Sequence, residues 1–236
     1  MTDAIVRLEG VSKQYGGLRP LRIRQLNVAA DERVALVGFD QPMAQVFVDL
    51  VTGATLPDAG HVTTFGRSTA SITDSGDWLA HVDRFGIVSE RAVLLESLTV
   101  LQNLSVPFTL DIDPPPADVT ARAQALGREV GLGDAERDAP VGTLDPAHRL
   151  LVRLGRALAL DPQVVLLEHP TASIEEGRRE SIGRAVLSVA RARRVAVISL
   201  TADRVFAAAA ADRVLEYDPA TGHLTARGGW LSRLIK

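Results

Sequence analysis

The sequence predicts an α/β fold in which a mostly parallel sheet carries helices on both faces. Apolar runs short enough for strands alternate along the chain with stretches in which apolar residues recur at helical spacing. Residues 163–167 and 195–200 are apolar almost throughout, which is typical of parallel strands covered on both faces. The 236 residues, 46% of them hydrophobic and 23% charged, suffice for one large domain or two tightly joined subdomains.

The expected elements follow the chain in order. The first half is expected to contain strands at about residues 6–11, 21–26 and 33–37, a helix at 42–51 closed by Gly53, a turn and strand within 54–66, and a strand at 85–88. The second half is expected to begin with a region at about 97–140, in which helical spacing over residues 98–104 is followed by a Pro-rich break at 111–116 and a second helix at about 116–130. After it we expect a helix at 146–160, a strand at 163–167, a helix at 175–193, a strand at 195–200, a short helix at 204–211 and a strand at 213–217. The stretch at 97–140 is interpreted as a helical insertion.

The composition excludes several kinds of chemistry. The chain has no cysteine, which excludes disulfides, thiolate nucleophiles and cysteine-ligated metals. Its formal net charge of −3 gives no overall basic field for nucleic acid, and its five histidines lack the spacing of metal ligands. The start of the chain lacks an apolar signal segment, and no apolar run approaches the roughly 20 residues of a membrane helix. We therefore expect no metal site, no nucleic-acid partner and no direct insertion into a membrane.

Four stretches resemble motifs of one known family. They are residues 34–38 with the helix that ends near Gly53, residues 98–104, residues 155–167 with Pro170 and Thr171, and residues 211–215. Their order and spacing resemble the ATP-binding cassette (ABC) ATPase domain of transporters over nearly the whole chain. The resemblance implies a P-loop NTPase-like cassette with a mostly parallel core sheet, helices on both faces, an N-terminal antiparallel β subdomain and a helical insertion.

The resemblance also implies how the chain is divided. We expect a single nucleotide-binding domain over residues 1–236. Residues 1–89 and 141–236 would form the core and the antiparallel β subdomain, and residues at about 90–140 would form the helical subdomain.

The segment at the position of the family's phosphate loop departs from the family pattern. That pattern has glycines whose N–H groups hold phosphates, a lysine that reaches the β- and γ-phosphates, and a hydroxyl that binds magnesium. The corresponding positions here hold Gly38, Asp40, Gln41, Pro42, Met43, Ala44, Gln45 and Val46. Ala44 stands at the lysine position and Gln45 at the hydroxyl position, and no lysine lies between residues 14 and 235. Pro42 lacks an N–H, and Asp40 adds a negative charge where phosphate would lie.

Either Asp40 or Gln41, followed by Pro42, also fits a purely structural role as the start of a helix. Aspartate is a favoured N-cap, and proline is favoured in the first helical turn. The start of this helix would then be satisfied by its own chain and not by an anion. We favour this interpretation over phosphate binding.

The position of the family's signature motif, Leu-Ser-Gly-Gly-Gln, is altered in the same way. It is occupied by Leu144, Asp145, Pro146, Ala147 and His148. An acid replaces the serine that contacts the γ-phosphate held by a second cassette, and both glycines are absent. Asp145 followed by Pro146 again favours a capped helix start over a phosphate contact, although His148 can still donate a hydrogen bond.

The other positions that handle metal, water or nucleotide in the family are occupied by Tyr15, Glu90, Glu168, His169 and Ala202. Glu168 and His169 replace the acidic pair that holds magnesium and polarises water; His169 is either a general base or a polar residue at a strand end. Glu90 stands at the glutamine loop, and Ala202 stands at the switch histidine without a donor. Tyr15 resembles the aromatic residue that stacks on adenine, and the alternative is a half-buried tyrosine at a strand end.

Three functions are compatible with these residues. The first, which we favour, is an ABC transporter cassette with a degenerate nucleotide site, a pseudo-ATPase that acts as a structural or regulatory subunit. The second is an active ABC ATPase with unusual site residues, and the third is a soluble interaction module that reuses the fold. No catalytic residue is assigned, and binding of ATP with magnesium is expected to be weak or absent.

The resemblance also implies partners and a location. A second cassette, in a homo- or heterodimer, and membrane-spanning transporter subunits are the expected partners. The chain is expected in the cytoplasm, held at the inner face of the cell membrane by those subunits. Residues 97–107 faintly resemble cassettes of lipoprotein-releasing and lipid-transport systems.

Overall fold

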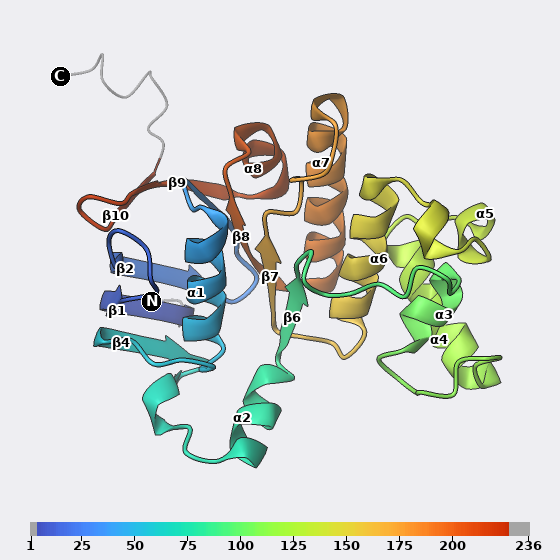
Figure 1. Cartoon of the computed structure of the whole chain (residues 1–236), viewed down its shortest axis with the longest axis horizontal. Coiled ribbons are helices and arrows are strands. Elements are labelled where there is room, and N and C mark those ends of the chain that lie inside the picture. The colour runs from blue at the N-terminus through green and yellow to red at the C-terminus, as the bar shows by residue number, and fades with distance from the viewer. Residues whose placement is uncertain (1–3, 227–236) are drawn as a thin grey trace.

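The computed structural model describes residues 4–226 and contains two sheets (Figure 1). The larger sheet has six strands in the order β10-β9-β3-β8-β7-β6. Its members are β3 (Arg33–Val37), β6 (Phe85–Val88), β7 (Val164–Glu168), β8 (Ala196–Thr201), β9 (Arg213–Asp218) and β10 (His223–Ala226). All neighbours pair in parallel except β10 and β9. This arrangement confirms the mostly parallel core sheet.

The smaller sheet is antiparallel and has the order β2-β1-β4-β5. It consists of β1 (Ala4–Lys13), β2 (Leu21–Ala29), β4 (Ala59–Thr64) and β5 (Arg67–Ser68). Its buried face shares one hydrophobic cluster with helix α1 (Gln41–Val51) and with one face of the larger sheet. The N-terminal antiparallel sheet predicted from the sequence is therefore confirmed.

Helices cover both faces of the larger sheet. Helix α1 packs on the face that carries Leu36, Leu166 and Ile198. Helices α6 (Pro146–Leu158) and α7 (Glu176–Arg193) pack on the opposite face with Val165 and Val197, and α8 (Arg204–Ala210) lies beside α7 on that side. Side chains alternate between the two faces of a strand, which explains why each buried strand is apolar throughout.

Three further helices form a helical lobe at one end of the molecule, on the right in Figure 1. They are α3 (Val100–Ser105), α4 (Ala117–Glu129) and α5 (Asp134–Arg137), followed by a 3-10 turn, η2 (Val141–Thr143). The lobe packs against α6 through one cluster that includes Leu104, Leu126 and Leu154. In the described part of the chain, no helix combines the length and apolar character needed to cross a membrane.

The structure adds elements that the sequence patterns did not predict. These are β5, the 3-10 turn η1 (Thr69–Ser71), α2 (Ser75–Val82), α5, η2 and β10. Helix α2 is only eight residues long and its buried residue is His81, so no buried apolar face marks it in the sequence. Asp74 caps it by accepting a hydrogen bond from the N–H of Asp77. Strand β10 is short and mostly exposed, and it pairs with β9 as a hairpin at the edge of the sheet.

Candidate functional site

In the loop between β3 and α1 (residues 38–40), a side chain of the loop caps the helix that follows. Asp40 is the N-cap of α1, and its Oδ1 accepts a hydrogen bond of 2.8 Å from the N–H of Met43. Pro42 is the second residue of the helix and has no N–H to offer. The predicted cap is confirmed, and it uses one of the N–H groups that would otherwise face an anion.

An aromatic contact anchors the same loop from below. Phe39 is 1% exposed and packs edge-on against Phe47 of α1, with ring centroids 5.9 Å apart, and at 4.6 Å against Tyr217 of β9. Gly38 has φ of 102°, and a Cβ there would lie 3.2 Å from the carbonyl oxygen of Tyr217. The loop therefore follows one tight path that is set by packing.

The remaining residues of the helix start divide between core and solvent. Ala44 is fully buried in the hydrophobic cluster beneath α1, whereas Gln41 and Gln45 are exposed. Met43 and Val46 are half-buried and pack against the same cluster. No cationic side chain is supplied by this turn of the helix.

Tyr15 lies beside the helix start. It is half-buried against the core cluster and lines a hollow of about 550 Å³ together with Asp40, Pro42, Met43 and Tyr217. Burial raises the pKa of the Tyr15 hydroxyl, and the negative charge of Asp40 raises it further. The structure thus brings Tyr15 and the start of α1 together around one hollow.

Glu168 ends β7 and is held by an arginine that sequence reasoning missed. Nη2 of Arg91 lies 2.6 Å from Oε1 and 2.8 Å from Oε2 of Glu168, and the hydroxyl of Ser89 lies 3.4 Å from Oε2. The Glu168 side chain is 3% exposed and that of Arg91 is 44% exposed. Both carboxylate oxygens are therefore satisfied by a cation of the chain itself.

His169 and Ala202 line a second hollow, of about 220 Å³, with Thr171, Arg179 and Asp203. His169 has φ of 42°, and its N–H donates to the carbonyl of the β8 residue Leu200. Its Nε2 is buried and has no hydrogen-bond partner among the described residues. Asp203 accepts from the hydroxyl of Thr171 at 2.8 Å and caps α8.

Glu90 lines neither the hollow beside Tyr15 nor the hollow beside His169. Its Oε1 accepts a 2.5 Å hydrogen bond from the hydroxyl of Ser173, in the turn after β7. Within residues 4–226, no group of three His, Asp or Glu side chains is placed to hold a metal ion.

Asp145 caps α6, as the sequence predicted. Its Oδ1 accepts from the N–H groups of Ala147 and His148 at 2.9 and 3.0 Å. Its Oδ2 lies 2.8 Å from Nδ1 of His148 and 2.9 Å from Nη1 of Arg178 in α7. Leu144, which precedes the cap, packs against the core, and Pro146 begins the helix.

These hydrogen bonds and the ion pair determine the pKa of Asp145. Burial by itself would raise the pKa of the carboxyl, but the hydrogen bonds from Arg178 and His148 outweigh burial and hold the pKa well below its ordinary value. The charged form therefore stabilises the fold at pH values above the unfolded-state pKa. That contribution is lost as the pH falls through the folded-state pKa.

We expect Asp145→Asn to lower the free energy of unfolding at pH 7 by about 0.5–1 kcal/mol, because asparagine keeps the cap and loses the charge. The gap between wild type and variant should close between about pH 5 and pH 2. Urea unfolding at several pH values measures it. Asp145→Ala, which also loses the cap, should cost about 1 kcal/mol more. An equal gap at pH 7 and pH 3 would show that the charge contributes nothing.

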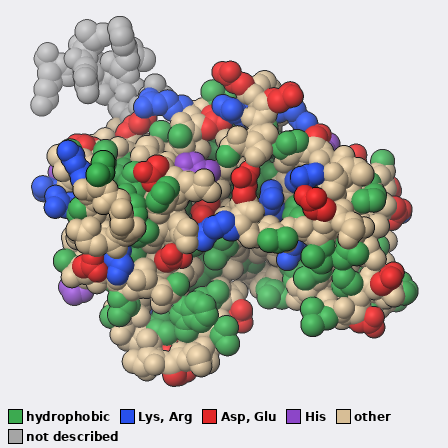
Figure 2. Space-filling model, in the orientation of Figure 1, with side chains coloured by type: hydrophobic (Ala, Val, Ile, Leu, Met, Phe, Trp, Pro, Cys, Tyr) green, Lys and Arg blue, Asp and Glu red, His purple; other side chains and the backbone are tan. Residues whose placement is uncertain are grey.

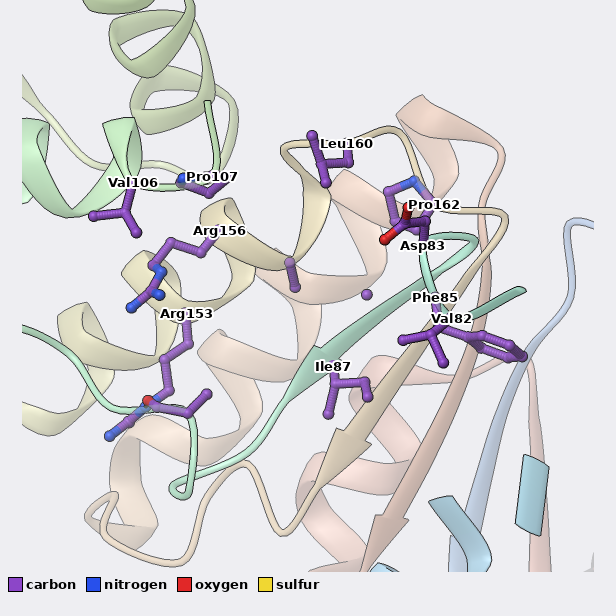
Figure 3. Close-up of a pocket in the computed structure, with 13 residues that line it drawn as sticks. Val82, Asp83, Phe85, Ile87, Val106, Pro107, Arg153, Arg156, Leu160 and Pro162 are labelled. Carbon is purple, nitrogen blue, oxygen red and sulfur yellow. The ribbon is translucent and has the colours of Figure 1, made fainter. Parts of the chain in front are cut away.

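A separate groove lies between β6, α6 and the end of α3 (Figure 3). Its volume is about 340 Å³, and its walls are mainly apolar, with Phe85, Ile87 and Leu160 among them. Arg153 and Arg156 reach into it from α6. Burial lowers the pKa of both guanidinium groups, and no carboxylate of the described residues lies within ion-pair distance of either.

The side chains that sequence reasoning missed are Phe39, Arg91 and Arg178. Phe39 is an apolar residue inside a polar loop, which is a signal for a buried anchor. For the two arginines the available signal was compositional: all basic residues except Lys13 and Lys236 are arginine. Arginine suits ion pairs with buried carboxylates because its planar fork can donate to both oxygens.

The parallel and antiparallel sheets, the helix after β3 and the helical lobe define an α/β cassette fold. The solved structures of cbiO1 from Clostridium perfringens, part of the ABC transporter complex cbiONQ, and of the dimeric ATP-binding cassette MJ0796 bound to ADP and Pi have this fold. The first superposes with a TM-score of 0.78 at 19% identity, covering 94% of this chain and 87% of that one. The second has a TM-score of 0.74 at 20% identity, covering 95% and 100%.

Sequence relatives identify the family more closely, although no protein-family model matches the chain. The lipoprotein-releasing system ATP-binding protein LolD of Xanthomonas campestris pv. campestris is 30% identical over 220 residues, which is 90% of each chain. LolD of Coxiella burnetii is 28% identical over 218 residues, which is 91% of this chain and 93% of the relative. The chain belongs to the family of ABC transporter ATP-binding cassettes.

Proposed function

We propose that this cassette is a structural or regulatory subunit of a transporter complex and does not hydrolyse ATP. The observation that carries the proposal is the start of α1, where the Asp40 carboxylate accepts from the N–H of Met43. In a phosphate-binding cassette, such N–H groups and a lysine receive the phosphates. Here a carboxylate takes that position and no lysine is available.

Electrostatics support the same conclusion. Two like unit charges 4 Å apart repel by about 4 kcal/mol at an effective dielectric constant of 20, so Asp40 opposes a nucleotide phosphate. Arg91 holds both oxygens of Glu168, which leaves no free carboxylate oxygen for magnesium there. The residues present therefore do not fit a magnesium–ATP complex, and we derive no hydrolytic step through it.

The start of α6, at the position of the family's signature motif, also supports a loss of nucleotide contacts. In the family this position would contact nucleotide held by a paired cassette, and here Asp145 is saturated by His148 and Arg178. A dimer of this chain with another cassette would have both composite sites altered. The role we propose is therefore shape and regulation within the complex.

The proposed partners are a second cassette and membrane-spanning subunits, with the chain at the cytoplasmic face of the membrane. The dimeric structure of MJ0796 and the lipoprotein-releasing role of the LolD relatives support this kind of assembly. The helical lobe and the groove beside α6 are the proposed contact surface for a membrane subunit. The groove's apolar walls and its two arginines without carboxylate partners suit an amphipathic segment.

Calorimetric titration of the purified chain with ATP, with and without magnesium, tests the proposal. We expect no heat of binding, or a Kd in the millimolar range, because the loop provides a negative charge in place of a positive one. The same titration on a LolD relative serves as the positive control. Micromolar binding would overturn the proposal and would require a hydrolysis assay.

A second candidate function, an active ATPase with unusual chemistry, is favoured by one observation. His169 lines the hollow with Ala202 and Asp203, and its buried Nε2 has no hydrogen-bond partner among the described residues, so this nitrogen would become a general base if the side chain turned into the hollow. If the chain hydrolyses ATP in this way, His169→Ala abolishes turnover, whereas Asp218→Asn, at the β9–β10 turn, leaves it unchanged. Undetectable nucleotide binding would exclude this function.

The third proposal is a soluble interaction module. The proteins that co-purify with the chain distinguish it from a transporter subunit. Purification of the native complex from membranes in detergent should recover a membrane-spanning subunit if the chain serves a transporter. Recovery of the chain alone, or with soluble proteins exclusively, would favour the module.

A further inference from the structure

We propose that Arg91 is a built-in cation that takes the place of a metal at Glu168 and ties the loop between β6 and α3 to the core. The loop (residues 89–95, called the 89–95 loop below) is the connection from the parallel sheet into the helical lobe. This inference rests on the proposed loss of nucleotide chemistry, because it assigns to Arg91 the positive charge that a bound metal would supply.

The ion pair joins a buried acid to a half-exposed base. Glu168 lies at the end of a central strand with its side chain 3% exposed, a position where an unpaired carboxylate is costly. Arg91 reaches in from the loop, and its Nη2 contacts both oxygens, at 2.6 and 2.8 Å. Without Arg91, Glu168 would be an uncompensated buried charge. Displacing the loop would break this pair, so the pair fixes the position of Arg91 and of the loop that carries it.

Other side chains tie the loop along its whole length. The hydrogen bonds run from Ser89 to Glu168, from Ser173 to Glu90, from Arg153 to the Ala92 carbonyl, from Arg156 to the Val93 carbonyl at 2.7 Å, and in both directions between Asn103 and the Leu95 backbone. The partners come from β7, the turn after β7, α6 and α3. Leu94 is buried in the hydrophobic cluster of the helical lobe. The loop is thus anchored to three core elements and to the lobe.

Arg91 also acts on α1. Burial raises the pKa of Asp49 in that helix, and the nearby charge of Arg91 opposes the rise. One guanidinium therefore lies within electrostatic reach of acids on α1 and on β7. The contacts of this cation join the sheet to the connection that leads into the lobe.

The consequence is a fixed position of the helical lobe without a nucleotide. A second ion pair holds the lobe at the C-terminal end of α6, where Arg193 of α7 pairs with Glu129 of α4. Arg193 also donates a hydrogen bond of 2.7 Å to the carbonyl of Leu158 in α6. Both links are formed within the chain. The 89–95 loop should therefore be equally protected with and without magnesium and ATP.

Amide hydrogen exchange of the full chain, followed for peptides that cover the 89–95 loop, tests the inference. Arg91→Met should speed exchange in this loop at least about tenfold, because a charge-assisted pair is lost. Arg91→Lys should give an intermediate rate, because lysine keeps the charge but carries it on a compact ammonium group that does not match the position of Nη2 between the two oxygens. Arg184→Met removes an exposed pair with Glu180 within α7 and should leave the loop unchanged.

A double variant keeps the test decisive if Arg91→Met unfolds. Arg91→Met with Glu168→Leu removes the buried charge together with its partner, so the midpoint of thermal unfolding should stay near the wild-type value. Exchange in the 89–95 loop of the double variant should nevertheless be at least about tenfold faster than in the wild type, as expected for Arg91→Met. Wild-type exchange rates in the double variant would overturn the inference.

Nucleotide separates this inference from the proposed function. Exchange of the wild-type loop should not change in millimolar magnesium and ATP. Protection of the loop by magnesium and ATP would overturn the inference. Calorimetric binding of ATP without any change in loop exchange would overturn the proposed function and leave the inference standing.

Discussion

Phe39→Ala is expected to lower the free energy of unfolding by about 3–5 kcal/mol, the cost of emptying a fully packed aromatic site. Phe39 is 1% exposed and contacts the rings of Phe47 and Tyr217, which belong to α1 and β9. The substitution leaves a cavity at the point where the β3–α1 loop meets the core. Urea unfolding followed by circular dichroism measures the change.

Phe39→Leu provides the matched control, since leucine refills most of the volume. It should cost clearly less than alanine, by the general rule that hydrophobic substitutions close to the original volume are tolerated best. If both variants unfold at the wild-type urea concentration, Phe39 does not anchor the loop. The proposal that this loop is set by packing and capping would then lose its support.

Gly86→Val is expected to lower the free energy of unfolding by about 3 kcal/mol, because overpacking against backbone cannot be relieved by a side-chain rotation. Gly86 lies in β6, where it pairs in parallel with Val165 of β7. A Cβ at this position would lie 2.4 Å from the carbonyl oxygen of Ala157 in α6. Either the strand or the helix must move, and the groove between them must change shape.

Gly177→Ala is the control for this glycine. Nothing lies within 4 Å of a Cβ at position 177, which is in the first turn of α7. Alanine there should leave stability unchanged or raise it by up to about 1 kcal/mol, since glycine disfavours a helix interior. A thermal-unfolding midpoint for Gly86→Val equal to that of Gly177→Ala would show that β6 and α6 do not need their close contact.

The surface explains why charge alone gave little guidance about partners. On the face drawn in Figure 2, Lys and Arg side chains are interspersed with Asp and Glu side chains. Many of these form short-range pairs, such as Arg67 with Asp77 and Arg33 with Asp212. Surface pairs of this kind contribute little stability, and on this face they leave charges of both signs next to one another.

The two helix starts at the site were predictable because their signals are local. Aspartate followed closely by proline at residues 40–42 and 145–146 satisfies the first N–H groups of a helix through atoms a few bonds away. The buried strands were predictable for a similar reason, because parallel strands covered on both faces are apolar throughout. Helix α2 and strand β10 were missed because neither buries a continuous apolar face.

Local pattern was therefore enough for the buried strands and the longer helices, for the α/β class and for the capped turns at positions 40 and 145. The ion pair between Arg91 and Glu168 and the salt bridge from Arg178 to Asp145 depend on segments that lie far apart in the chain. The contact of Phe39 with Tyr217 is equally long-range. A charge can be placed on a strand by sequence pattern, but its partner is chosen by how the elements pack, since burial makes each unpaired charge costly.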